Sequence, residues 1–395
     1  MRYRTLDSVR GIAAFAVLLC HVLMTFPGGG EDRTALLEHG FNAPQAWLYA
    51  TPLRLLVNGP AAVLLFFVLS GFVLTLSLSS ERRPSYAAFA VSRFARIWLP
   101  FAVAIIASAA LNFCFAARPV PGTSIWFRGG TWHEPLTFAN IARHLAMTGT
   151  AGDLDNPMWS LIHELRISLI FPLIVLVTLR FRVVALIASA LLSLASIWVV
   201  GNFGLPAYLD SWVQTGTYIY FFVVGVLLAT HAGRARAALD NAPREAIAGL
   251  WVLALLGLTI APPDTSRVTS LSNGVLLIVS GLAAGLIIAL SIMSGRTERA
   301  LTARLPLFLG RISYSLYLTH VIVIATVVHG IAGTWPLPIA VAFSLPLAVL
   351  IADLCQRYVE APSQRLGKWV ASRIGRSDKI DSDRLGTFGL SSAGD

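Results

Sequence analysis

Residues 6–21, LDSVRGIAAFAVLLCH, open a long apolar stretch that carries a cation at Arg10 and an imidazole at His21. The spacing of these two residues is about three helical turns, so both side chains lie on one face of a helix, roughly 16 Å apart along its axis. Arg10 can therefore stay at a membrane surface while His21 lies about halfway through a ~30 Å hydrocarbon core. An ionisable group at that depth indicates function by default. The alternative is a structural histidine bonded to a neighbouring helix.

The composition indicates a multi-pass membrane protein, because 56% of the 395 residues are hydrophobic and only 13% are charged. The net charge is +10, but the cations are spread over short loops, so we expect no nucleic-acid partner. Cys20, Cys114 and Cys355 lie inside apolar stretches and predict no disulfide framework. The histidines lack ligand spacing, so we expect no metal site.

The predicted fold is an all-α integral membrane bundle of about ten transmembrane helices. The apolar stretches lie near residues 9–27, 60–79, 97–116, 157–179, 183–200, 216–231, 246–262, 272–293, 307–331 and 337–358. They are continuous rather than alternating, which excludes a transmembrane β-barrel. Most Lys and Arg residues lie in the connections that share a side with the N-terminus. This pattern predicts that both termini are cytoplasmic and that the protein lies in the inner or plasma membrane.

We expect residues 1–365 to form the membrane domain. Residues 366–395 are rich in Arg, Ser, Asp and Gly and are expected to form a disordered cytoplasmic tail. The long outer loops, 28–59 and 117–156, are expected to form short interfacial helices over the mouth of a cavity.

Arginines gather at the inner membrane face. The motif SRFARIW places Arg93 and Arg96 one helical turn apart, and two guanidiniums on one face suit phosphate binding. Positive-inside topology or binding of lipid headgroups explains the pair equally well. Together with Arg10 and Arg311 at the same face, the pair would form a basic collar for a polyphosphate.

Two further motifs place polar groups inside the bundle. In FFVLSGF, Ser70 precedes a glycine that permits close approach to a neighbouring helix, and plain helix packing explains it. In NPMWSLIHELRISLIFP, Trp159 is expected in the outer aromatic belt, Ser160 follows it, and Glu164 lies about two turns inside. Glu164 either pairs with an arginine of another helix or orients His21 or a sugar hydroxyl.

The stretch LGRISYSLYLTH, residues 309–320, repeats the layout of the first span. Arg311 lies at the inner surface and His320 about 13 Å deeper, and Tyr317 shares a helical face with His320. A structural histidine is again the alternative. At the end of the last span, Glu360 is expected to pair with the surrounding arginines.

These motifs, taken in order, resemble the membrane acyltransferase 3 family over roughly residues 5–365. The elements that carry the resemblance are the spacing of Arg10 and His21, FFVLSGF, the pair Arg93 and Arg96, the W-S-L-x-x-E pattern, SYSLYLTH and the terminal VEAP. The resemblance implies transfer of an acyl group, usually acetyl from cytoplasmic acyl-CoA, to a hydroxyl of a glycan, a lipid-linked saccharide or a small molecule.

On this reading acyl-CoA is a co-substrate rather than a bound cofactor, and the other partners are a saccharide or glycolipid acceptor and membrane lipids. The expected sites follow: Arg10, Arg93, Arg96 and Arg311 hold the CoA phosphates, His21 and Glu164 are catalytic, and Ser70, Trp159, Ser160, Tyr317 and His320 orient the substrates. His21 would act as the base or become transiently acylated. A transporter or flippase, or a non-catalytic membrane module that binds lipid or glycan, remains as an alternative from another class.

Overall fold

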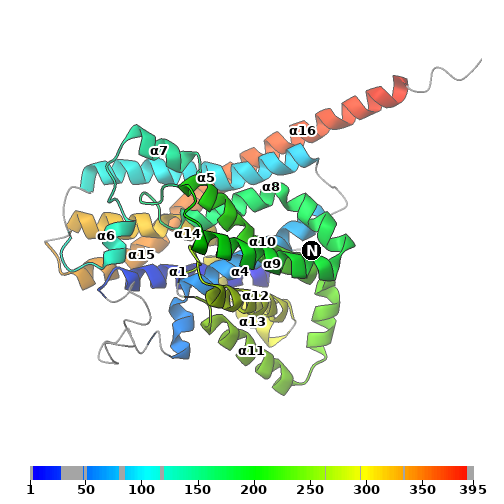
Figure 1. Cartoon of the computed structure of the whole chain (residues 1–395), viewed down its shortest axis with the longest axis horizontal. Helices are drawn as coiled ribbons and strands as arrows, with labels where there is room; N and C mark the ends of the chain where they lie inside the picture. Colours follow the sequence, from blue (N-terminus) through cyan, green and yellow to red (C-terminus); the bar gives the residue numbers. More distant parts are fainter. Residues whose placement is uncertain are drawn as a thin grey trace, which may run out of the picture.

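The computed structural model describes residues 3–27, 48, 51–79, 85–115, 120–262, 264–293, 295–331 and 334–388, with side chains described as far as residue 374. Every element in these ranges is helical (Figure 1). The helices are α1 (Arg4–Met24), η1 (Pro52–Val57), α4 (Gly59–Leu78), α5 (Tyr86–Phe115), α6 (Ile125–Gly130), α7 (Phe138–Leu145), α8 (Met158–Arg180), α9 (Arg182–Asn202), α10 (Ala207–Asp240), α11 (Arg244–Thr259), α12 (Leu271–Ser291), α13 (Arg296–Leu301), α14 (Arg304–Ile331), α15 (Leu337–Cys355), η2 (Gln356–Glu360) and α16 (Ala361–Phe388).

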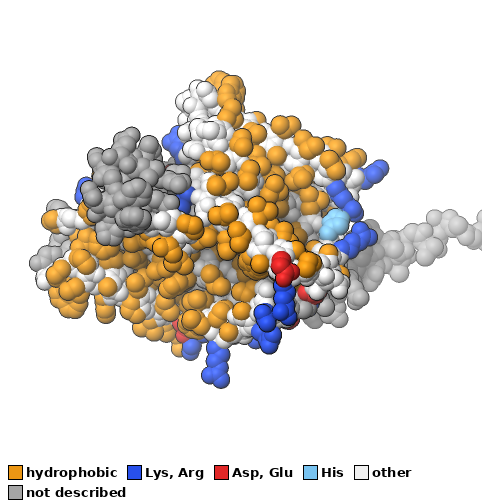
Figure 2. Space-filling model, turned by 90° about the horizontal axis from the view of Figure 1, so that it is seen from below, with side chains coloured by type: hydrophobic (Ala, Val, Ile, Leu, Met, Phe, Trp, Pro, Cys, Tyr) orange, Lys and Arg blue, Asp and Glu red, His pale blue; other side chains and the backbone are white. Residues whose placement is uncertain are grey.

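The predicted all-helical membrane class is confirmed, because nine helices in the described ranges are long and apolar enough to cross a membrane. The predicted seventh span, 246–262, forms α11, whose 16 residues make a helix of about 24 Å. Figure 2 shows one face of the bundle covered by hydrophobic side chains, with Lys and Arg near its margins. Such a surface suits lipid rather than water.

The tail departs from the prediction. The boundary expected after residue 365 falls inside α16, which continues from α15 and η2 and packs along α5 (Figure 1). Gly367 lies against this neighbour, since a Cβ added there would meet the Cβ of Ala95. The first turns of α16 are therefore part of the folded bundle, because backbone contact with α5 stabilises a segment whose composition alone is typical of disorder. Residues 389–395 lie outside the described residues.

Two glycines bring α1 and α14 into backbone contact. A Cβ added at Gly11 would collide with the backbone of Gly310, and a Cβ added at Gly310 would collide with the carbonyl of Asp7. Ten residues further along each helix, about 15 Å, His21 meets His320. The two helices are thus parallel and in register, and glycine at the crossing is what lets them approach this closely.

A second glycine contact joins α4 to α10. A Cβ at Gly71 would collide with the backbone of Phe222, and one at Gly225 with that of Val68. The expected packing role of the FFVLSGF motif is confirmed, because its glycine lies at the closest approach of these helices. Ser70, the residue before it, turns to a different partner, described below.

Residues 120–157 cover one end of the bundle and carry α6 and α7, toward the left in Figure 1. We call this segment the cap. Short helices were expected in the loop 117–156 over the mouth of a cavity; the two helices are found there, but the cavity described below opens at the other end of the bundle. Ser124 fixes the cap to the end of α1: its backbone N–H donates to Thr25 O at 3.0 Å and its hydroxyl donates to Met24 O at 2.5 Å. Most of the other expected loop, 28–59, lies outside the described residues before η1.

Candidate active site

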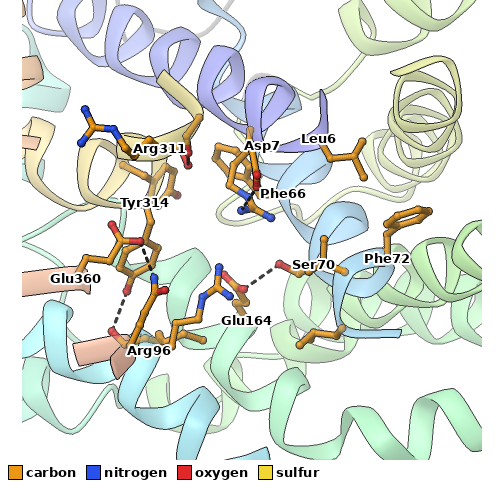
Figure 3. Close-up of a pocket in the computed structure, with 18 of the residues that line it drawn as sticks. Leu6, Asp7, Phe66, Ser70, Phe72, Arg96, Glu164, Arg311, Tyr314 and Glu360 are labelled. Atoms are coloured by element: carbon orange, nitrogen blue, oxygen red, sulfur yellow. Dashed lines mark hydrogen bonds and ion pairs between the residues drawn. The ribbon is translucent and has the colours of Figure 1, made fainter. Parts of the chain in front are cut away.

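A cavity of about 920 Å³ opens at the end of the bundle opposite the cap. This size is within the range of small-molecule and cofactor sites. Residues of α1, α4, α5, α8, α14, η2 and α16 line it (Figure 3). Its cations are Arg4, Arg10, Arg93, Arg96, Arg311 and Lys368, and its acids are Asp7, Glu164 and Glu360. We call this opening the arginine end, and its excess of positive charge favours an anionic ligand.

Arg93 has an acidic partner inside the bundle. Its guanidinium donates to Glu164 Oε1 and to the Ser168 hydroxyl, both at 3.0 Å, and its side chain is 9% exposed. Ser70 donates to the same Glu164 oxygen at 2.9 Å (Figure 3). This is the cross-helix ion pair that was one of the two readings of Glu164.

Arg96 has no hydrogen bond or ion pair with the described residues and is only partly buried on the cavity wall (Figure 3). Arg10 lies 3.8 Å from Asp7, a loose pair, whereas Arg311 is held by Asp353 at 2.8 Å. Arg96 is therefore the guanidinium of the predicted collar that is most available to a ligand. Because Arg93 and Arg96 are one helical turn apart, the sequence could not show which of them has an acidic partner and which is available to a ligand.

Glu360 also faces the cavity, but its partners are not the expected arginines. Its carboxylate accepts from the Ser315 hydroxyl at 2.7 Å and from Gln364 at 2.9 Å. The acid that pairs with Arg311 is Asp353. Glu360 belongs to η2, a π-helical turn, and such turns are common at functional sites.

The inner end of the cavity is closed by hydroxyl and aromatic side chains. Ser160 of α8 and Tyr317 of α14 line it, and their hydroxyls are 2.6 Å apart. Phe66 of α4 lies edge-on to Tyr317, with ring centroids 5.4 Å apart. The cavity lining on α14 ends at Tyr317, one helical turn before His320.

The two predicted histidines meet just beyond this wall. His21 Nδ1 lies 2.9 Å from His320 Nε2, and His320 Nδ1 lies 2.9 Å from the carbonyl of Leu316. A carbonyl only accepts, so His320 Nδ1 carries the proton, and Nε2 of the neutral ring accepts from His21 Nδ1–H. This arrangement leaves His21 Nε2 with a free lone pair, which is what a general base or an acyl carrier needs.

Trp126 of the cap covers His21. The indole stacks on the imidazole with centroids 5.1 Å apart and an interplanar angle of 25°. The Ser124 bonds to the end of α1 hold α6 in this place. His320 is fully buried while His21 is half-buried, so the pair is reached through His21.

The structure brings together most of the predicted site residues, but in two groups. Those that line the cavity are Arg10, Ser70, Arg93, Arg96, Ser160, Glu164, Arg311 and Tyr317. His21 and His320 form the second group. The hydrogen-bond partner of His21 is His320, and the partners of Glu164 are Arg93 and Ser70, so Glu164 does not orient His21 directly as one reading expected.

Trp159 does not line the cavity, and its side chain is only partly buried. Its ring packs inside the bundle, 5.7 Å from Tyr218 and 6.5 Å from Phe67 between ring centroids. The expected depth is consistent with its place at the first turn of α8, but helical rotation turns the indole inward. Periodicity could not predict this, because polar residues such as His163, Glu164 and Arg166 occur on several sides of the first turns of α8 and leave no single apolar face.

Asp155, just before α8, was not singled out by sequence. Its side chain is fully buried, and neither carboxyl oxygen has a hydrogen-bond partner among the described residues. Burial raises its pKa well above the ordinary value, because desolvation penalises the carboxylate. Its neighbour Asn156 lies beside Trp126, since the same added Cβ at Gly130 would contact both. A buried acid left without a partner among the described residues is a mark of a functional site.

Comparison with known proteins places the chain by sequence. The family model described as "Acyltransferase domain" (Acyl_transf_3) matches residues 3–357. The O-acetyltransferase PaAT-1 of Phomopsis amygdali is 24% identical over 95% of this chain and 85% of its own length. The acyltransferase MdmB of Streptomyces mycarofaciens is 26% identical over 93% of this chain and 92% of its own length. No solved structure matches the chain.

Proposed function

The chain belongs to the acyltransferase 3 family and is an O-acyltransferase of the membrane, and from this premise we propose that it moves an acetyl group from acyl-CoA to a hydroxyl of a saccharide, cell-surface glycan or glycolipid. The observation that carries the proposal is a basic cavity that ends one helical turn short of a hydrogen-bonded histidine pair. An anionic donor with a long thin arm fits this sequence of environments.

The donor phosphates bind at the arginine end. Arg96 supplies the free guanidinium, and Arg10, Arg311 and Arg4 surround the same opening. Arg93 acts through Glu164, because its guanidinium is already engaged there. The pantetheine arm then runs toward Ser160 and Tyr317, which close the inner end of the cavity.

The chemical step belongs to His21. Its Nε2 takes the proton of the acceptor hydroxyl as the oxygen attacks the thioester carbon. The carbon–sulfur bond breaks, and the CoA thiolate receives the proton in turn. His320 holds the imidazole in the tautomer that leaves Nε2 free. In a two-step route the same nitrogen would carry the acyl group.

We place the protein in the inner or plasma membrane with both termini cytoplasmic, so that the arginine end faces the pool of acyl-CoA. The concentration of Lys and Arg on that side supports this orientation. The acceptor would then reach His21 from the cap side.

The test is incubation of the purified protein with labelled acetyl-CoA and a panel of saccharide and glycolipid acceptors. We expect label on an acceptor hydroxyl, loss of at least about 10²-fold in turnover for His21→Ala, and a folded variant by thermal denaturation. His163→Gln is the matched control, since His163 is buried on α8 with Thr215 as its partner and does not touch the pair. Near-normal turnover by His21→Ala would overturn the assignment of the base. If the unmodified protein consumes no acetyl-CoA, the transporter is the favoured alternative.

A further inference from the structure

The wall at the inner end of the cavity is held from two sides. Tyr317 is 5% exposed, and its hydroxyl bonds to Ser160 at 2.6 Å and to the carbonyl of Pro157 at 3.3 Å. Phe66 packs against the Tyr317 ring at an angle of 89°. A tyrosine fixed at its tip and against its ring cannot move aside without breaking these contacts.

Further aromatic rings pack together beside this wall. Phe67 is 2% exposed and packs on Tyr218, with centroids 4.9 Å apart, and on Phe222, at 5.9 Å. Close-packed aromatic side chains yield little space, because moving one requires the next to move. Both Phe66 and Phe67 border the cavity, but Phe66 is only partly buried and packs on Tyr317 rather than on these rings.

The position of the wall decides where an acyl chain can go. The wall separates the cavity from the histidine pair, so the acyl end of a donor can come no nearer to His21 than Phe66 and Tyr317, and the chain attached to the carbonyl carbon has to lie against these two rings. In a pocket that fits a small acyl group, each additional methylene that does not fit lowers kcat/KM by roughly 10- to 200-fold.

We propose that Phe66 and Tyr317 restrict the donor to short acyl chains, two or three carbons long, and that Phe66 is the residue that sets the limit. The inference rests on the proposed use of acyl-CoA and adds to it the class of donor. Phe66 sets the limit because its ring lies against Tyr317 at the inner end of the cavity and is only partly buried, whereas Phe67 is fixed among the buried rings of Tyr218 and Phe222.

The test compares acetyl-, propionyl-, butyryl- and hexanoyl-CoA with the unmodified protein and with Phe66→Ala. The unmodified protein should lose kcat/KM by at least about 10-fold for each methylene beyond propionyl. Phe66→Ala should accept butyryl-CoA to within a few-fold of acetyl-CoA. Phe66→Leu, which removes less volume, should fall between the two and guards against a variant that fails to fold.

Two further variants separate the ring from other causes. Phe94→Ala removes an aromatic side chain that is 43% exposed and stacks on Trp98 away from the main cavity, and it should keep the original chain-length preference. Tyr317→Phe keeps the ring and should also keep the preference, even where its rate falls. A folded Phe66→Ala that uses acyl-CoA with an unchanged preference overturns the inference alone. Failure of every variant to consume any acyl-CoA overturns the proposed function together with it.

Discussion

Arg93 and Arg96 lie one helical turn apart on α5, yet in the described part of the chain only Arg93 has an acidic partner. The difference follows from burial. Arg93 points between helices, where an unpaired guanidinium would be costly, whereas Arg96 borders the cavity, where water or an anion can meet it. The two residues of one motif therefore have separate tasks, one in the framework and one in the ligand site.

Alanine at each position should separate these tasks. Arg96→Ala removes a charged hydrogen-bond donor from the ligand site, so the KM for acyl-CoA should rise by about 10- to 100-fold with little change in thermal stability. Arg93→Ala leaves Glu164 without its cation and should cost about 3 kcal/mol of unfolding free energy. Steady-state kinetics and denaturation in detergent measure both. Equal effects of the two variants on KM and on stability would contradict the separation.

Asp155 predicts a pH dependence. The folded state raises its pKa, so folding favours its protonated form. The stabilising contribution of this group is therefore complete below the unfolded-state pKa of about 3.9 and is lost as pH rises through the folded-state pKa. Asp155→Asn should make the protein more stable at neutral pH and remove this part of the pH dependence.

The measurement is the melting temperature of both proteins between pH 4 and pH 8. Asp264→Asn, at an exposed loop position, is the control and should shift stability by less than about 0.5 kcal/mol. A stabilised Asp155→Asn that has also lost turnover would show that the carboxyl is kept for activity at the expense of stability. Lower stability at every pH would contradict an unpartnered carboxyl.

Much of the site could be predicted at the residue scale, because the chemistry of Arg, His and Glu inside apolar stretches is visible without coordinates. The pairing of His21 with His320 could not, since the two are far apart in sequence and only a helix contact joins them. A signal was nevertheless present. In each motif a glycine adjoins the arginine, Arg10–Gly11 and Gly310–Arg311, and small residues are typical of close helix contacts.

At the scale of elements, the parallel pair α1 and α14 sets the geometry of the site. Its crossing depends on two residues without side chains, Gly11 and Gly310. The sequence predicted both helices, but it could not show that they are neighbours, because the apolar pattern of a helix does not reveal which helix packs against it. The predicted span 246–262 agrees with α11 to within a few residues, whereas α16 was missed because its polar composition is typical of a disordered tail.

Gly310→Ala tests the crossing. The added methyl group would collide with the backbone of α1, so the helices must separate, and we expect lower thermal stability together with a large loss of turnover. Gly249→Ala in α11 is the matched control, because nothing lies within 4 Å of its added Cβ. That variant should be neutral or stabilising by about 0.5–1 kcal/mol. Similar behaviour of the two variants would contradict the role of the crossing.

At the scale of the whole molecule, the two ends of the membrane domain meet. Arg4 at the start of α1 and Gln364 and Lys368 of α16 line the same cavity. An odd number of crossings would place these segments on opposite sides of the membrane. We therefore expect α11, the shorter helix, to complete an even number with the nine longer ones. The C-terminal end of α11 is held against the bundle, because the buried Arg54 donates hydrogen bonds to the carbonyls of Thr259 and Ala261.

Topology reporters can show whether α11 crosses the membrane. Tags at the N-terminus and after residue 241 should be accessible from the cytoplasm, and a tag after residue 262 should be accessible from the opposite side. Protease protection in sealed vesicles of both orientations gives the readout. Tags after residues 241 and 262 on the same side would show that α11 does not cross.

The contact of Gly11 with Gly310 has a mechanical consequence. Two rods pinned at one point can move relative to each other chiefly by rotation about that pin. Arg10 and Arg311 each adjoin the pin, whereas His21 and His320 lie ten residues, about 15 Å, beyond it, so a small rotation at the arginines becomes a larger displacement at the histidines. A donor that draws Arg10 and Arg311 together would thereby alter the separation of His21 and His320. By thermodynamic reciprocity, a ligand bound at the histidine pair would change the affinity for the donor by the same factor by which the donor changes the affinity for that ligand.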